Sequence, residues 1–467
     1  MKTLRSTCNS LRHSILLALS APLAACGSTP APTDAGPTGS DTGPMEMTDA
    51  RMRPDAGPTN DAFEGAETIT TDGTAAMDAI EAPEDVDFFR FEGTAGQWVS
   101  INTSANPDDD PELVDTVITL YDASRTQIAE NDDRIPRGDT DSEIVIQLPD
   151  TGTYYLEVQE FSTWMPADPP MPEGRGAYTY SLTVTELTQG GALFIDAEPG
   201  DDAATAAPIT FGGMSSNLAF VLGDFADATD VDVFRFTVPA AAGGLLSVDI
   251  MPHGPDGYGS TRAAGNVRVT DMAGTAVIAR VEPRGMTQLD LSPTLVPGTE
   301  YLLWVDAGGG TTGSNDHYVL KAFVGTENPP ENEMTPGSND TTATATALTT
   351  EDDMGVLRTF VLGTLPSGDG GDVYSVDVPA GRQINVFCGA QSVGSGVRGL
   401  RTVLLGSDGT TMVAMASETA TEGAAIQNAM PAAAGTHYVR VTAGTQDPAV
   451  RGDFYRCGIA LTTPMAP

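Results

Sequence analysis

The strongest constraint on the fold is an internal repeat. The segment DVDFFRF, which begins at Asp85, returns as DVDVFRF at Asp230 and, weakened to GDVYSV, at Gly371. A second segment, GTYYLEV at Gly152, returns twice in altered form at the same spacing of about 140 residues. Two independent markers therefore predict three homologous domains of ordinary size. We call them repeats 1, 2 and 3, at residues 60–188, 189–326 and 327–467.

Inside each repeat the hydrophobic pattern has a period of two. Residues 117–121, 144–148 and 178–184 are rich in β-branched and aromatic residues, and turn clusters separate these runs. No amphipathic helical stretch of twelve or more residues competes with them. The pattern predicts an all-β chain of three tandem antiparallel β-sandwich domains, jelly-roll-like in topology.

The first 25 residues have the organisation of a signal peptide. Three basic residues and no acidic one precede an apolar run at residues 15–25, which is too short to span a bilayer. The run ends in LAACG at residues 23–27, which resembles the lipobox of bacterial lipoproteins. The resemblance implies cleavage before Cys26 and lipidation of its thiol, and Gly27 after it favours the outer membrane, on the periplasmic face or at the cell surface. The alternative is an ordinary signal peptide whose cleavage site precedes a cysteine.

Residues 26–59 consist mainly of Pro, Gly, Thr, Asp and Ala. They contain too few large apolar side chains to offset the entropy lost on ordering, so we expect a disordered tether. No later stretch approaches the roughly 18 apolar residues that a transmembrane helix requires. The lipid is therefore the expected attachment to the membrane.

The chain is strongly acidic, with 23 basic and 64 acidic residues and a formal charge of -41. Such a balance argues against nucleic acid as a partner, because phosphate binding requires clustered Lys and Arg. A well-hydrated surface would by itself account for the charge. Carboxylate oxygens also suit divalent cations such as calcium, and composition does not choose between these readings.

Four cysteines are present. Cys8 lies in the signal peptide and Cys26 is expected to carry lipid, which leaves Cys388 and Cys457 in an oxidising compartment. We predict a disulfide between them. Aligned by hand with repeat 2, the two cysteines replace a pair of apolar, inward-facing strand residues, Ile250 and Leu320.

Each repeat resembles the bacterial pre-peptidase C-terminal domain, a β-sandwich often appended to secreted peptidases and related to clostridial collagen-binding domains. The resemblance covers most of residues 60–465. It depends on the DxDxFxF strand, the LYD…NDD stretch at residues 120–133, the GTYYLxV strand and the closing YxYSLxV strand. Repeat 1 matches closely, repeat 2 moderately, and repeat 3 lacks the first Asp and the NDD.

The resemblance also implies calcium as a cofactor. In calcium-binding relatives a leading segment and the acids before the repeated phenylalanine share one ion, which needs six to eight oxygen ligands. The same acids could instead be turn residues on an acidic surface. The implied ligands are Asn60, Asp61, Glu84 and Asp87 in repeat 1, Glu198, Asp201, Asp230 and Asp232 in repeat 2, and Asn339, Asp340, Asp369 and Asp372 in repeat 3.

The sequence contains no familiar catalytic pattern. There is no HExxH, no GxSxG elbow and no phosphate-binding glycine loop. We expect His437 to be a surface strand residue, and His317 likewise, rather than catalytic bases. Trp98 and Trp304 lie in predicted strands and are expected in the core. The chain is therefore not expected to be an enzyme.

One loop, residues 161–176, is an insertion confined to repeat 1 and carries Trp164 among prolines. It could form a contact for a sugar or protein ligand, although such a tryptophan more often packs back on its own domain. Two functions remain open. The first is a surface-displayed binding or adhesion module for extracellular polysaccharide or protein. The second is an accessory subunit of a separate secreted hydrolase.

Overall fold

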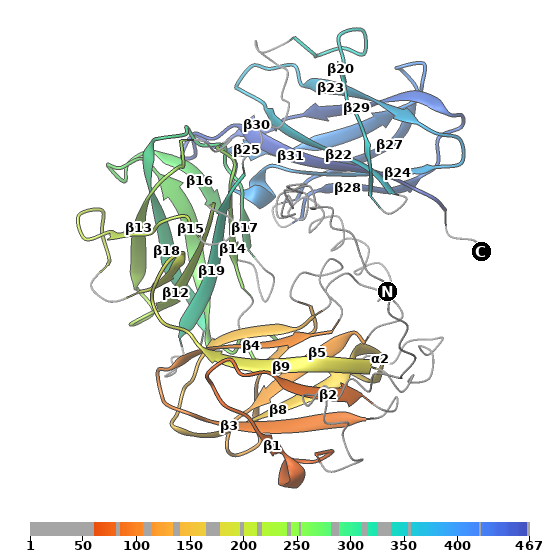
Figure 1. Ribbon diagram of the computed structural model, residues 1–467. Coiled ribbons are helices and arrows are strands. Elements are labelled where there is room, and N and C mark those ends of the chain that lie inside the picture. The colour runs from red at the N-terminus through yellow and green to blue at the C-terminus, as the bar shows by residue number, and fades with distance from the viewer. Residues whose placement is uncertain are drawn as a thin grey trace, which may run out of the picture.

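A computed structural model shows a chain built almost entirely of strands (Figure 1). It describes residues 60–80, 85–105, 114–133, 141–164, 178–196, 200–212, 217–240, 244–251, 254–281, 289–310, 316–325, 338–353, 356–419 and 422–464. The predicted signal peptide, Cys26 and the tether lie outside the described residues, as do Glu84 and Glu198. The predicted all-β fold of tandem sandwiches is confirmed. No helix in the described ranges is long and apolar enough to cross a membrane.

Repeat 1 forms two facing sheets. A 3-10 turn, η1 (Phe63–Gly65), precedes them, and a short helix, α2 (Phe161–Trp164), follows β8. One sheet has the order β1 (Glu67–Thr68), β3 (Val86–Gly93), β8 (Gly152–Glu160), β5 (Thr116–Tyr121) and β6 (Gln127–Asn131). The other has the order β2 (Ala76–Ile80), β9 (Tyr178–Glu186), β4 (Trp98–Ser104) and β7 (Glu143–Gln147).

Repeat 2 has the same arrangement with one extra edge strand, β10. Its first sheet has the order β11 (Ala207–Pro208), β13 (Val231–Thr237), β18 (Glu300–Gly310), β15 (Arg262–Thr270) and β16 (Val277–Val281). Its second has the order β10 (Leu193–Ile195), β12 (Leu218–Asp224), β19 (His317–Val324), β14 (Leu246–Ile250) and β17 (Leu289–Leu291).

Repeat 3 follows the same plan. Its first sheet has the order β20 (Thr346–Ala347), β23 (Asp372–Val378), β29 (Gly435–Thr442), β26 (Arg401–Leu405) and β27 (Met412–Ser417). Its second has the order β21 (Glu351–Asp353), β22 (Val356–Thr364), β31 (Phe454–Thr462), β24 (Gln383–Gly389) and β28 (Ala424–Ala429). A further pair, β25 (Val397–Arg398) and β30 (Thr445–Gln446), and the 3-10 turn η2 (Gln391–Val393) lie beside repeat 2 in Figure 1.

The alternation of the repeated strand explains how each core forms. In β13, Phe234 and Phe236 point into the sandwich and Arg235 between them is exposed, as expected for side chains that alternate between the two faces of a strand. The aromatic residues therefore fill the space between the two sheets. Each repeat has its own buried cluster of this kind.

The predicted disulfide is confirmed. Cys388 and Cys457 are bonded, lie directly opposite each other on β24 and β31, and are buried in the core of repeat 3. Their counterparts by strand register, Ile250 and Leu320, are likewise paired and buried in repeat 2. The disulfide therefore occupies the position of an apolar cross-strand pair.

The repeats are packed against each other. Trp98 and Val145 on the outer face of repeat 1 form one buried cluster with Leu222, Tyr258 and Val319 of repeat 2. Between repeats 2 and 3, backbone bonds join Arg280 N to Gly394 O at 2.9 Å and Gly452 N to Ile278 O at 3.0 Å. Phe454 of repeat 3 lies in the buried cluster of repeat 2.

These contacts correct two predictions about exposure. His317 is buried at the boundary between repeats 1 and 2, because its ring lies edge-on to Trp98 and its Nε2 is 2.9 Å from Tyr258 O. His437 is buried as well, with Nδ1 2.9 Å from Gly435 O. Neither is a surface residue.

Of the two predicted core tryptophans, Trp98 is buried and Trp304 is not. Trp98 is buried in the contact between repeats and not between the sheets of its own sandwich. Trp304 is only half-buried on the outer face of repeat 2, where its Nε1 donates to Thr270 Oγ1 at 2.9 Å and Arg268 lies over its ring. A tryptophan within a strand has an even chance of facing either side, so strand membership alone did not place them.

Candidate functional site

A buried aspartate occupies the same place in all three repeats. Asp87, Asp232 and Asp372 lie in the repeated strands β3, β13 and β23, and all three are buried. An ionised carboxylate in such a position needs a partner, because removal of its hydration is costly. The surrounding residues therefore show what the position can bind.

The first partner is a tyrosine from the closing strand. Tyr180 Oη donates to Asp87 at 2.6 Å, and Tyr455 Oη donates to Asp372 at 2.5 Å. Burial and the neighbouring carboxylate raise the pKa of both tyrosines, so each stays protonated as the donor. Tyr318 is the counterpart in repeat 2 by strand register. Sequence analysis did not identify these tyrosines, although the second Tyr of the closing-strand motif YxYSLxV recurs at this position in all three repeats.

The second partner is the leading segment of each repeat. Its backbone carbonyl accepts a hydrogen bond from the residue after the buried aspartate, always at 2.9 Å. The three bonds run from Phe88 N to Asn60 O, from Val233 N to Gly200 O and from Val373 N to Asn339 O. The leading segment and the repeated strand are thus brought together as the family resemblance implied.

The buried aspartate of repeat 2 is strongly perturbed by its surroundings. Burial raises the pKa of Asp232 to about 9, and the negative charges of Asp196 and Asp230 add to this. A polar interaction with Tyr318 offsets only part of the effect, and neither carboxylate oxygen of Asp232 has a hydrogen-bond partner of ordinary geometry. Asp196, just after β10, was not among the predicted ligands. The sequence feature that could have identified Asp196 is its position two residues before Glu198.

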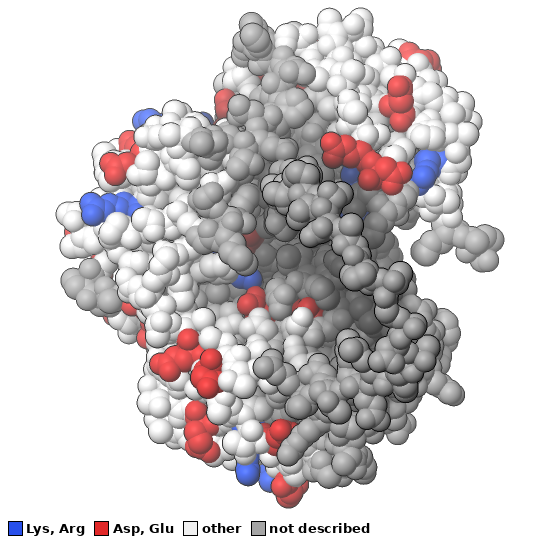
Figure 2. Space-filling model, viewed as in Figure 1, with Lys and Arg blue, Asp and Glu red and all other residues white. Residues whose placement is uncertain are grey.

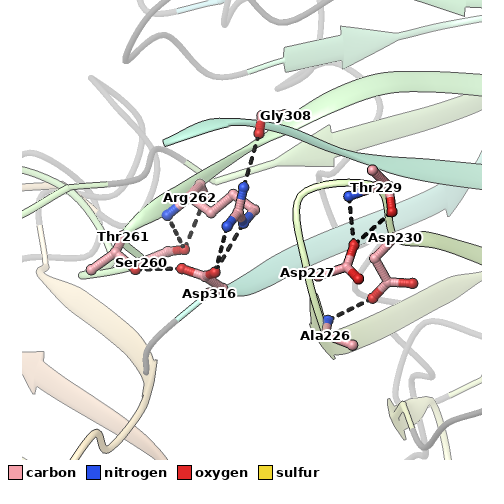
Figure 3. Close-up of polar contacts among 9 residues, drawn as sticks. All are labelled: Ala226, Asp227, Thr229, Asp230, Ser260, Thr261, Arg262, Gly308 and Asp316. Atoms are coloured by element: carbon pink, nitrogen blue, oxygen red, sulfur yellow. Dashed lines mark hydrogen bonds and ion pairs between the residues drawn. The ribbon is translucent and has the colours of Figure 1, made fainter. Parts of the chain in front are cut away.

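Not every predicted ligand faces the site. Asp61 and Asp201 are exposed, and Asp201 Oδ1 accepts from Gly200 N at 3.1 Å. Asp230 is used to close a turn, since Oδ2 accepts from Ala226 N at 2.6 Å and Oδ1 from Val231 N at 2.8 Å (Figure 3).

In repeat 3 the leading segment approaches the turn before β23. Asp369 Oδ1 accepts from Gly371 N at 2.8 Å. Asp340 lies against Gly370, so close that a β-carbon there would be 2.5 Å from Asp340 Oδ2. Asp340 and the buried Asn339 each have a side-chain oxygen that is shielded from solvent and has no hydrogen-bond partner. Oxygen atoms of this kind suit a hard cation.

The described residues nevertheless contain no group of three or more His, Cys, Asp or Glu side chains already arranged for a metal. In repeat 1 the Asn60 Nδ2 donates to Asp78 Oδ2 at 3.1 Å. The oxygen donors fit calcium in type, and the buried Asp232 fits it in charge, but closure around an ion requires further ligands.

A buried ion pair positions Tyr318. Arg262 Nε donates to Asp316 Oδ2 at 2.9 Å, Nη1 donates to Gly308 O at 3.2 Å, and Thr261 Oγ1 donates to Asp316 Oδ1 at 2.5 Å (Figure 3). Asp316 immediately precedes β19, so these bonds hold the start of the strand that carries the tyrosine.

Trp164 lies at the end of α2, with its ring centroid 5.6 Å from that of Phe161. Burial raises the pKa of the Glu130 carboxyl group on β6. A hydrogen bond from Trp164 to this group offsets part of that effect. The tryptophan thus contacts its own domain. The rest of the loop lies outside the described residues.

The described residues show no catalytic constellation. Both described histidines are buried against backbone carbonyls, and neither is paired with a nucleophile in these contacts. Figure 2 shows acidic side chains spread over all three repeats, with few basic ones on that face.

Comparison with known proteins identifies the first repeat. Residues 85–160 match the family model of the bacterial pre-peptidase C-terminal domain. A probable subtilase-type serine protease of Deinococcus radiodurans is 42% identical over 76 residues, which are 16% of this chain and 10% of that protein. The chain therefore spans about a tenth of the length of that relative.

Solved structures give weaker similarities. The pre-peptidase C-terminal domain of a Bacillus anthracis collagenase is 16% identical, covers 26% of this chain and 94% of its own, and has a TM-score of 0.19. The PBSX exported protein XepA is 13% identical, covers 50% and 82% respectively, and has a TM-score of 0.15. The family match and the motifs agree on one region: repeat 1 contains, at residues 85–160, a bacterial pre-peptidase C-terminal domain.

Proposed function

We propose that this chain is a non-catalytic binding protein, held at the outer membrane by a lipid on Cys26, which presents three β-sandwiches to extracellular polysaccharide or protein. One observation carries the proposal. The described residues form three packed sandwiches of one kind, and the first carries the pre-peptidase C-terminal signature. No catalytic group is found among these described residues. An array of this kind is suited to a function in binding.

A second candidate is an accessory subunit of a separate secreted hydrolase. The family match supports it, because a similar domain is present in the Deinococcus protein described as a subtilase-type serine protease. Affinity capture from solubilised membranes distinguishes the two. A glycan or matrix ligand on an array supports the binding protein, whereas a stoichiometric hydrolase supports the accessory subunit.

The proposed attachment is tested by Cys26→Ser. Without the thiol there is no site for the diacylglyceryl group, so we expect the chain to leave the membrane fraction or to remain uncleaved. Fractionation and electrophoretic mobility report the result, and Cys8→Ser is the matched control. A Cys26→Ser protein that fractionates and migrates as the unaltered chain does would show that the lipoprotein assignment is wrong.

We also propose that repeat 2 binds calcium at Asp232, with Asp196 and Glu198 as further carboxylate ligands. The support is the buried Asp232, whose oxygens lack hydrogen-bond partners beside two other acids. A cation would neutralise this repulsion and stabilise the folded chain by linkage.

Calorimetry and thermal unfolding of the whole lipid-free chain, stripped with chelator and titrated with calcium, test this site. Asp232→Asn and Asp196→Asn should reduce the heat of binding and the thermal shift. Asp227→Asn is the control, because Asp227 accepts from Thr229 in the neighbouring turn (Figure 3) and an asparagine oxygen can do the same. If millimolar calcium produces neither heat nor a shift in Tm, the calcium assignment is wrong.

A further inference from the structure

Each repeat uses one side to contact the repeat that follows it. We call this the tail side. It consists of the neighbouring edge strands of the two sheets: β6 and β7 in repeat 1, β16 and β17 in repeat 2, and β27 and β28 in repeat 3. In Figure 1, β16 and β17 of repeat 2 lie beside the strands of repeat 3. The tail side of repeat 3 has no following repeat among the described residues.

The backbone contacts of the two tail sides are equivalent. Glu130 N of β6 donates to Gly257 O of repeat 2 at 3.1 Å, and Arg280 N of β16 donates to Gly394 O of repeat 3 at 2.9 Å. Strand register places Glu130 and Arg280 at the same position, each one residue after the buried Ala129 or Ala279. The residue at that position in β27 is Met415. Its backbone therefore lies where the other two repeats bind their neighbour.

The opposing surface is also equivalent between repeats. We call it the head face, and it lies on the outer side of β12 and β19 in repeat 2 and of β22 and β31 in repeat 3. Val319 of repeat 2 packs in one cluster with Val145. At the same register in repeat 3, Arg456 Nη2 donates to Ser292 O at 2.7 Å. The cross-strand partners of Val319 and Arg456 are Leu222 and Leu362.

In repeat 1 the head face is on β2 and β9, and no repeat in the described part of the chain packs against it. At the position of Leu222 and Leu362 it carries Met77, which pairs with Ser181. Leu222 and Leu362 are 1% and 9% exposed, whereas Met77 is 51% exposed. Within the described residues, the three repeats therefore leave an exposed head face on repeat 1 and an exposed tail side on repeat 3.

Both open surfaces expose methionine side chains. Met412, Met415 and Met430 on the tail side of repeat 3 are 56%, 55% and 54% exposed. With Met77 they make up four of the six large hydrophobic residues that are exposed in the described part of the chain. Methionine packs adaptably against irregular surfaces, and edge strands offer unpaired backbone groups. The charge at the equivalent position of the covered tail sides, Glu130 and Arg280, has been replaced by an apolar side chain in Met415.

We propose that copies of this chain associate head to tail, with the tail side of repeat 3 bound to the head face of repeat 1 of a second copy. The occupant follows from the two interfaces within the chain, which join a tail side to a head face of the same kind. Such a contact uses different surfaces on the two partners and is heterologous, so it leads to open chains or rings and not to a closed two-fold dimer.

Sedimentation velocity of the whole lipid-free chain, from about 1 to 100 µM, tests the proposal. We expect concentration-dependent oligomers beyond the dimer. Met415→Asp and Met77→Asp should each weaken association about tenfold or more, because a charged carboxylate would have to lose its hydration at the contact. Met272→Asp is the matched control: it is an exposed methionine that belongs to neither surface. Far-ultraviolet circular dichroism and Tm verify that every variant is folded.

Mixing the two variants distinguishes the interface type. The Met77→Asp chain keeps its tail side and the Met415→Asp chain keeps its head face, so a mixture should form dimers of one of each and stop there. If the unaltered chain is monomeric throughout the range, the proposal is wrong. It is also wrong if Met415→Asp abolishes association that Met77→Asp leaves intact, since that outcome indicates pairing of two β27 edges.

Discussion

Single residues in this protein behave according to where the repeats meet as much as to their own strand. His317 is the clearest case. Burial lowers its pKa to about 4, against smaller opposing effects from Tyr258 O and the Asp316 carboxylate. The ring is therefore neutral near pH 7, with Trp98 on one side. Protonation would place a charge in the contact between repeats 1 and 2.

This gives a pH dependence with a definite sign. The unfolded chain binds a proton at His317 near pH 6.5 and the folded chain only near pH 4, so the stabilisation from the neutral ring is present above pH 6.5 and is lost as the pH falls toward 4. The loss can reach about 3 kcal/mol. His317→Gln should lose less stability than the unaltered chain over that window in urea unfolding. Parallel curves for the two proteins would contradict the assignment.

At the scale of elements, the three repeats show that one arrangement of strands accommodates different pairs of core side chains. The closing strand places Leu320 opposite Ile250 in repeat 2 and Cys457 opposite Cys388 in repeat 3. The disulfide spans 69 residues. A cross-link over such a loop reduces the conformational entropy of the unfolded chain. In the chain-entropy model this increases the free energy of unfolding by about 4 kcal/mol.

Two double variants separate the cross-link from the packing. Cys388→Ser with Cys457→Ser should lower the free energy of unfolding of repeat 3 by about 4 kcal/mol or more, because it removes the bond and buries two hydroxyls. Cys388→Ile with Cys457→Leu reproduces the pair of repeat 2 and should recover part of this loss. Denaturant titration measures both. Equal stability of the two variants would mean that apolar packing at this position contributes nothing.

At the scale of the whole molecule, the repeats are not structurally independent domains. Phe454 begins the closing strand of repeat 3, yet it lies in the buried cluster of repeat 2, and Arg456 donates to Ser292 O of that repeat. Repeat 3 therefore covers the edge strands β16 and β17 of repeat 2, which would otherwise expose backbone groups.

Removal of this contact from repeat 3 should also affect repeat 2. We expect Phe454→Ala to destabilise by about 3–5 kcal/mol and to accelerate amide hydrogen exchange in β16 and β17, although the substitution is in another repeat. Phe91→Ala, the same truncation in the core of repeat 1, should leave exchange in β16 and β17 unchanged. Unchanged exchange in the Phe454→Ala chain would show that the repeats fold separately.

Much of this architecture was accessible from the amino-acid sequence. The spacing of two markers predicted the repeats, the period of two predicted strands, and the even pair of remaining cysteines predicted the disulfide, because each of these is a local pattern or a count. Asp87, Asp232 and Asp372 were also singled out, as calcium ligands implied by the family resemblance, but their burial was not predicted. These inferences needed no knowledge of distant contacts.

The tertiary structure decided what those elements touch. Tyr180 and Tyr455 meet their aspartates across about 80 to 90 residues of sequence, and Trp98, His317 and Met415 depend on which sheet face or edge meets another repeat. A strand pattern states that a side chain lies on one face or the other, but it does not state what covers that face. The repeats and their strands followed from the sequence alone, whereas the partners of the buried acids and the surfaces between repeats came only from the packing of distant segments.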